Sequence, residues 1–184
     1  MKTLVSLALS FCFLFSSSSV FATELVDIGP AVGSIVDEID VLDSTGQPQK
    51  IKSLAGSKGL VLVLFRSADW CPYCKKHLIE AGTWQKDLEK RGFSLAAISY
   101  DSPKVLAKFR DVKNINYPLL SDQNQKTFSA FGVLNVEHKK GSHGFGIPYP
   151  GVIVFDAEGK AKYKYFYQGY KKRASWDLID VATR

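Results

Sequence analysis

Residues 59–78, GLVLVLFRSADWCPYCKKHL, join a continuous apolar run to a pair of cysteines. The apolar stretch Gly59–Phe65 predicts a β-strand that is buried on both faces. The apolar residues that follow the cysteines recur at helical spacing: Leu78, Ala81, Trp84 and Leu88. Gly92 is placed to end that helix. The stretch therefore predicts a strand, a short loop and a helix that begins at the Cys-Pro-Tyr-Cys motif.

The position of Cys71 at the start of this helix favours redox chemistry. Pro72 follows it, at a position where a missing N–H costs nothing. Unpaired amide groups and the helix dipole stabilise a thiolate there, and Lys75 and Lys76 add positive charge. Cysteines in such settings have pKa values of about 3.5–7.5, against about 8.5 for a free thiol. We expect Cys71 to be the attacking nucleophile and Cys74, one turn into the helix and more buried, to be the resolving cysteine.

Two other roles are open to the cysteine pair. A permanent structural disulfide across two residues would close a tiny loop and constrain the unfolded chain very little. A zinc site would have to combine the pair with His138 and His143, which lie far along the chain. His77 is nearly opposite Cys71 on the helix and is expected to be a packing or surface residue. We predict no metal and no cofactor beyond a redox-active Cys71–Cys74 disulfide.

The rest of the chain alternates strands and helices. Phe93–Tyr100 predicts a second buried strand, and the sequence from Asp101 predicts a helix with Val105, Phe109 and Val112 on one face. Further expected elements are a hairpin around Ser44–Gln47 with a helical turn after it, a helix near Gln125–Phe131, a hairpin over Gly151–Tyr167 that turns at Asp156–Gly159, and a last helix over Ala174–Val181. This order predicts an α/β sandwich with a mixed central sheet.

The N-terminus has the features of a secretory signal. One basic residue, Lys2, precedes the apolar run Leu4–Phe15, and small residues stand at the two positions that a signal peptidase inspects. The apolar run is shorter than the roughly 20 residues of a membrane-spanning helix. We therefore expect a signal peptide over residues 1–22, a single domain over 23–184, no membrane anchor after cleavage, and export, in a bacterium to the periplasm.

The net charge of +6 is spread along the chain and is densest at Tyr163–Arg173. This segment is interpreted as a solvated edge strand and its turn rather than as a nucleic-acid site. No nucleic-acid partner is expected.

Three segments together resemble the redoxin branch of the thioredoxin fold, which contains the alkyl hydroperoxide reductase and thiol-specific antioxidant proteins. They are VLVLFRSADWCPYCKKHL, AISYDSPKVLAKFRDVKNINYPLLSDQNQKTFSAFGV and GIPYPGVIVFDAEGKAKYKY. The resemblance implies a thioredoxin-like three-layer sandwich with an N-terminal hairpin extension and a peroxiredoxin-type insertion. It also implies a cis-proline at Pro150, preceded by Tyr149, facing the disulfide. Substrate contacts are expected from Trp70, Pro72, Tyr73, Tyr149 and Pro150.

The chain departs from that family at the peroxide pocket. Peroxiredoxins carry P-x-x-x-T/S-x-x-C, but counting back from Cys71 gives Ala68 and Leu64, and counting back from Cys74 gives Cys71 and Ser67. The buried Asp of many thioredoxins is replaced by Phe65.

These departures favour an exported thiol–disulfide oxidoreductase. Its partners would be a thiol or disulfide protein substrate and an electron donor or acceptor that the sequence does not identify. The alternatives are a thiol-dependent peroxidase and a CxxC protein that binds copper(I) or zinc. Copper(I) favours soft thiolates, but the single methionine, Met1, leaves with the signal.

Overall fold

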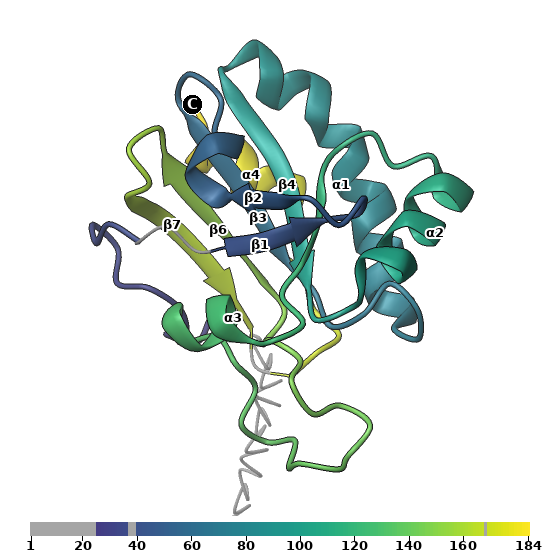
Figure 1. Ribbon diagram of the computed structural model, residues 1–184. Helices are drawn as coiled ribbons and strands as arrows, with labels where there is room; N and C mark the ends of the chain where they lie inside the picture. Colours follow the sequence, from purple (N-terminus) through teal and green to yellow (C-terminus); the bar gives the residue numbers. More distant parts are fainter. Residues whose placement is uncertain (1–24, 37–39, 168) are drawn as a thin grey trace, which may run out of the picture.

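One seven-stranded sheet organises the chain, in the strand order β2-β1-β5-β4-β3-β6-β7 (Figure 1). The computed structural model describes residues 25–36, 40–167 and 169–184. The strands are β1 (Asp40–Asp43), β2 (Pro48–Lys50), β3 (Gly59–Leu64), β4 (Phe93–Ser99), β5 (Leu119–Ser121), β6 (Gly151–Asp156) and β7 (Ala161–Phe166). The expected signal peptide, residues 1–22, lies outside the described residues.

The sheet is mixed, as the sequence predicted. β3 pairs with β4, and β4 with β5, in parallel, while β1–β2, β1–β5, β3–β6 and β6–β7 are antiparallel. All six residues of β3 are buried, which explains why that strand reads as an unbroken apolar run. β7 is an edge strand, in agreement with the interpretation of the basic segment at Tyr163–Arg173.

Helices cover both faces of the sheet, and this confirms the α/β sandwich. They are η1 (Ile51–Leu54), α1 (Pro72–Lys90), α2 (Pro103–Lys113), α3 (Lys126–Ala130) and α4 (Trp176–Ala182). Apolar residues of α1, α2 and α4 share one core cluster with Val61 and Val63 of β3. Phe128 of α3 and Phe131 join the cluster on the opposite face, with Leu60 and Leu62. Because successive side chains of β3 point to opposite faces of the sheet, the strand contributes to both core clusters.

Two details of the fold differ from the sequence prediction. The buried face of α2 carries Leu106 and Phe109, whereas Val112 is 64% exposed. Val112 stands in the last turn, just before Asn114 ends the helix in a left-handed conformation. The three-residue strand β5 was not predicted, since three residues are too few to show a period. β5 attaches the N-terminal hairpin to the sheet through β1.

Within residues 25–36, 40–167 and 169–184, no helix combines the length and the apolar character that a membrane crossing requires.

Candidate redox site

The Cys-Pro-Tyr-Cys motif caps α1. Cys71 is the N-cap residue in an extended conformation, Pro72 is the first helical residue, and the Cys74 N–H donates to Cys71 Sγ at 3.3 Å. The two cysteines form a disulfide with their Cα atoms 5.2 Å apart. The sequence predicted Cys74 to be more buried than Cys71, but both are enclosed, with exposed fractions of 0% and 1%. The predicted difference in burial between the two cysteines is therefore absent.

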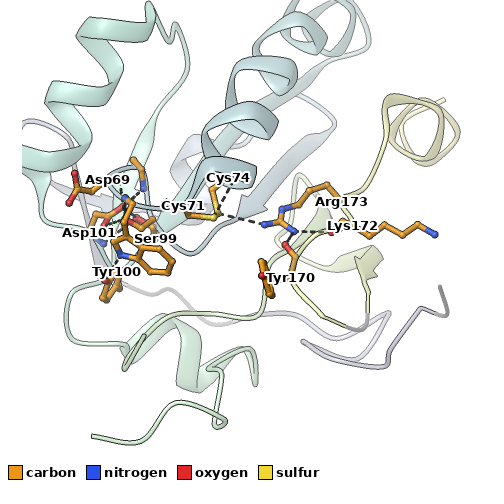
Figure 2. The surroundings of a disulfide bond; sticks show 12 residues. Asp69, Cys71, Cys74, Ser99, Tyr100, Asp101, Tyr170, Lys172 and Arg173 are labelled. Carbon is orange, nitrogen blue, oxygen red and sulfur yellow. Dashed lines mark hydrogen bonds between the residues drawn. A yellow bond between two sulfur atoms is a disulfide. The ribbon is translucent and has the colours of Figure 1, made fainter. Parts of the chain in front are cut away.

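A buried carboxylate fixes that loop from the end of β4 (Figure 2). Asp101 accepts hydrogen bonds from Ser67 Oγ at 2.8 Å, the Ala68 N–H at 2.6 Å and Ser99 Oγ at 2.9 Å. Burial raises the pKa of this carboxyl, although the three hydrogen bonds act in the opposite direction. Because the Ser67 hydroxyl is bound to Asp101, it is not free to contact a substrate at the cysteines.

Trp70, beside Cys71, is held on three sides. Its Nε1–H donates to Tyr100 Oη at 2.9 Å, the Arg66 guanidinium lies 4.7 Å from its ring centre, and the His143 ring lies 4.9 Å away. The indole is therefore held by Tyr100 just after β4, by Arg66 in the loop before the motif and by His143 in the segment before β6.

Arg173 is the cation that contacts a sulfur atom. Its Nη2–H donates to Cys74 Sγ at 3.6 Å, and Nη1–H donates to the carbonyls of Tyr170 and Lys172 (Figure 2). Burial, and secondarily Arg66, lower the pKa of Arg173 to about 10, so it is charged at neutral pH. The sequence analysis counted only Lys75 and Lys76 as nearby positive charge; the structure adds a guanidinium from beyond β7.

His77 is a packing residue, as expected. It is 3% exposed, its ring lies 5.5 Å from the Trp84 ring, and its Nε2 lies 3.1 Å from the Ala174 carbonyl oxygen. Because a carbonyl only accepts, Nε2 carries the hydrogen and Nδ1 is left without a partner. Burial lowers the pKa of His77 to about 4, and Arg173 acts in the same direction.

A pocket of about 240 Å³ is lined in part by residues that contact Trp70 and Tyr73. Its lining residues are Arg66, Asn135, Glu137, His138, Tyr149, Pro150, Gly169 and Tyr170. The pocket is linked to the motif by two contacts, since Arg66 lies on Trp70 and the Tyr170 ring packs edge-on to Tyr73 at 5.8 Å. Tyr73 itself is 41% exposed, and Pro72 is exposed. Of the five predicted substrate-contact residues, Trp70, Pro72 and Tyr73 lie beside or between the cysteines, and Tyr149 and Pro150 line this pocket; their role stays a prediction.

The cis-proline prediction is wrong. No cis peptide bond occurs among the described residues, and these include Tyr149 and Pro150. Pro148 bridges Leu134 and the Tyr149 N–H donates to the Val133 carbonyl at 2.8 Å, so the chain already runs extended before it enters β6. Pro150 lines the pocket described above, whereas the resemblance implied that it faces the disulfide.

The zinc alternative finds no support in the arrangement of side chains. In the part of the chain that the structure describes, no group of three or more His, Cys, Asp or Glu is placed to hold a metal ion. His143 packs on Trp70 and His138 lines the pocket, so neither joins the cysteines.

Four site residues were missed in the sequence: Arg66, Asp101, Tyr170 and Arg173. Arg66 lies within residues 59–78, the stretch that predicted the redox motif, but was not identified as a site residue. Tyr170 and Arg173 belong to a basic segment that was interpreted as solvated, and Asp101 was taken only as part of a helix start. A charged residue directly after a fully buried strand is the signal that could have pointed to Arg66.

The family model for the AhpC/TSA family matches residues 32–164. The chain belongs to this family. A Mycobacterium tuberculosis protein named for the peroxiredoxins is 31% identical over 130 residues, 68% of this chain and 82% of that protein. A second M. tuberculosis protein that is also named as a peroxiredoxin is 33% identical over 101 residues, and the match spans only 65% of its length. Peroxiredoxin Bcp of Escherichia coli is 27% identical over 131 residues, 71% of this chain and 82% of that protein.

Solved structures agree with this assignment. Peroxidoxin BcpB from M. tuberculosis superposes with a TM-score of 0.68 at 25% identity, over 85% of this chain and 94% of that one. A thiol peroxidase from Chromobacterium violaceum gives a TM-score of 0.70 at 22% identity, over 85% and 89%, which shows the shared fold. These relatives confirm the family resemblance and the thioredoxin-like α/β architecture.

Proposed function

We propose that this protein is a thiol-dependent peroxidase that cycles between a Cys71–Cys74 dithiol and the corresponding disulfide. The observation that carries the proposal is the pair of thiolate-stabilising contacts: the start of α1 at Cys71 and the Arg173 guanidinium at Cys74. Membership of the AhpC/TSA family supports a hydroperoxide as the oxidant.

The reaction uses both sulfur atoms. The Cys71 thiolate attacks the terminal oxygen of a hydroperoxide, the O–O bond breaks, and the alcohol leaves after it takes up a proton. Cys71 is now a sulfenic acid. The Cys74 thiolate attacks Cys71 Sγ and expels hydroxide, which is protonated to water, so that the disulfide forms. An external thiol then reduces the disulfide and restores the dithiol.

Reduction of a protein or small-molecule disulfide is a second candidate. It is favoured by the two residues at the motif positions before the cysteines: Ala68, at the position of the peroxiredoxin Thr or Ser, has no hydroxyl, and the Ser67 hydroxyl is bound to Asp101. A disulfide needs no such hydroxyl, since the attacked sulfur leaves as a thiolate.

Stopped-flow fluorescence separates the two candidates. Trp70 adjoins Cys71, so oxidation of the reduced protein by hydrogen peroxide should change its emission, with Cys71→Ser as the control. We expect oxidation about a hundredfold faster than that of free cysteine, the scale that preorganised donors provide. The variant Cys74→Ser should stop at a sulfenic acid on Cys71, visible by mass spectrometry.

Oxidation no faster than free cysteine, combined with rapid oxidation by a disulfide, would assign the second candidate instead. Trapping of the sulfenic acid on Cys74 in the Cys71→Ser variant, at the rate of the unaltered protein, would reverse the roles of the two cysteines.

Export is part of the proposal and rests on the signal-like N-terminus. Fractionation of a bacterium that expresses the full chain tests it. We expect the cleaved form in the periplasm, and recovery of the uncleaved chain in the cytoplasm would contradict export.

A further inference from the structure

We propose that Arg66 binds a carboxylate of the substrate, so that the enzyme prefers small hydroperoxides or disulfides that carry one. The inference builds on the proposed redox function and names the substrate class. It rests on a guanidinium that the fold holds in place at a pocket but leaves without an acceptor.

Arg66 is positioned by two aromatic rings. Its guanidinium carbon lies 4.7 Å from the Trp70 ring centre and 4.6 Å from the Tyr170 ring centre. These two cation–π contacts restrain the guanidinium, whose N–H donors lie in its own plane. A fixed guanidinium plane is what two-pronged recognition of a carboxylate requires.

The donors of Arg66 have no acceptor among the residues described. Nε is fully enclosed without a hydrogen-bond partner, and no carboxylate of the described chain lies within ion-pair distance of the guanidinium. A buried donor without an acceptor costs about 1–3 kcal/mol, and more when it is charged. Nε itself is enclosed, so a ligand oxygen in the adjoining pocket would instead be bound by the two Nη groups of the guanidinium.

The pocket offers a second donor and no competing anion at its base. Asn135 is 8% exposed, and its Oδ1 accepts the Glu137 N–H, which leaves its amide hydrogens for a ligand. The one carboxylate in the lining, that of Glu137, is exposed and makes no ion pair with Arg66. Arg173 adds charge nearby, since its proximity to Arg66 lowers its own pKa. The local potential therefore favours an anion.

The pocket is linked to the cysteine motif through its lining residues. Arg66 contacts Trp70, which directly precedes Cys71, and Tyr170 contacts Tyr73, which directly precedes Cys74. A volume of about 240 Å³ admits a short acid rather than a protein segment. With the carboxylate on Arg66, the O–O or S–S bond of such a molecule would extend toward Cys71.

The carboxylate of the substrate takes no part in bond making or bond breaking, so the reaction steps are those given above. A hydroperoxide is reduced to the alcohol and water. A disulfide accepts the Cys71 thiolate, releases one thiolate, and releases the second when Cys74 closes the protein disulfide. In each case the protein dithiol supplies the two electrons.

Matched oxidants test the preference. The reduced protein is mixed, in separate arms, with dithiodipropionate, bis(hydroxyethyl) disulfide or cystamine, and with hydroperoxymethylpentanoate or its methyl ester. We expect the carboxylate to react about tenfold faster than its neutral partner, as one charge-assisted hydrogen bond provides. The preference should weaken as salt is added. If the carboxylate preference is larger among the hydroperoxides, the substrate is a hydroperoxide that carries a carboxylate; if it is larger among the disulfides, the substrate is a disulfide that carries one.

Substitutions assign the preference to Arg66. Arg66→Gln should abolish the preference, measured as the ratio of the charged to the neutral oxidant's rate in the same variant. Arg66→Lys should retain part of it, and Lys86→Gln, which removes a charge from the exposed face of α1, should leave it intact. An undiminished preference in Arg66→Gln, or equal rates for charged and neutral oxidants in the unaltered protein, would overturn the inference.

An equilibrium measurement keeps the inference separate from the proposed function. The disulfide form, which does not react, is titrated with glutarate while the Nε–Hε NMR signal of Arg66 is followed. A saturable shift supports the site even if every oxidant reacts slowly, in which case only the proposed function fails. No shift, together with no rate preference, removes the carboxylate site.

Discussion

The two sides of the Cys71–Cys74 disulfide differ in how fully their polar groups are satisfied. On the side of β4, Asp101 accepts three hydrogen bonds, and Tyr100 accepts a fourth from Trp70. On the side of the segment after β7, Arg66 Nε, Arg173 Nε and His77 Nδ1 are all enclosed without a partner. We call these the closed side and the open side.

This difference suggests that one side stabilises the structure and that the other takes part in reaction and binding. A closed network holds a backbone in one arrangement, because breaking any bond in it leaves a buried group unpaired. Unpaired charged donors are costly for folding and are expected where a ligand or a reacting thiolate completes them. The closed side should therefore determine stability, whereas the open side should determine rate, pH dependence and substrate choice.

The largest effect is expected at the centre of the closed side. Asp101→Ala removes the acceptor of the Ala68 N–H and of two hydroxyls, and should reduce the free energy of unfolding by about 3 kcal/mol. Urea denaturation measures the loss. The neighbouring control Asp69→Ala alters an exposed side chain and should change stability by less than about 0.5 kcal/mol. A loss of under about 1 kcal/mol for Asp101→Ala would show that the network is not a support.

On the open side, His77 should make stability depend on pH. Its pKa is about 4 in the folded protein and 6.5 when unperturbed, so the unfolded chain binds more protons between these values. Stability should therefore fall as the pH falls from 6.5 toward 4, by about 2–3 kcal/mol at pH 4.5.

The variant His77→Phe isolates this effect. It keeps a ring against Trp84 but cannot titrate, so its stability should lack the decline. Asp101 and Asp122, whose pKa values are raised by burial, act in the opposite direction and are common to both proteins. Parallel stability curves for the two proteins between pH 7 and 4.5 would contradict the assignment.

A smaller effect, in rate rather than stability, is expected at Arg173. Arg173→Met removes the cation at Cys74 Sγ, so Cys74 becomes a poorer leaving group when a thiol attacks Cys71. Reduction of the disulfide by dithiothreitol should slow about tenfold, and the Cys74 pKa, measured by thiolate absorbance in Cys71→Ser, should rise by about one unit. Arg173→Lys should restore part of both. An unchanged Cys74 pKa would leave Arg173 a purely structural role.

The smallest effect should come from the edge of the closed side. Tyr100→Phe removes the acceptor of the Trp70 Nε1–H and should cost about 0.5–1 kcal/mol, because the indole is only half-buried and water can replace the phenol. The carboxylate preference assigned to Arg66 should persist in this variant. Loss of that preference would mean that the two sides are coupled through Trp70.

Local patterns in the sequence determined most of the fold. The unbroken apolar run of β3, the helical spacing of Leu78, Ala81, Trp84 and Leu88, and the turn residues of the two hairpins each specify one element, and the structure contains them all. The motif likewise placed Cys71 at the start of α1 with Pro72 after it. These signals lie within a few turns of chain, where period and capping chemistry act directly.

Tertiary structure alone decided the surroundings of the disulfide. Arg173 reaches Cys74 from 99 residues away, and Tyr170 covers Arg66, because β7 pairs with β6 and β6 lies beside β3. The strand β5 also follows from that pairing order rather than from local preference. The sequence by itself therefore determined where the two thiols stand, and the strand order decided which charges and which pocket face them, since contacts between distant segments leave no periodic trace along the chain.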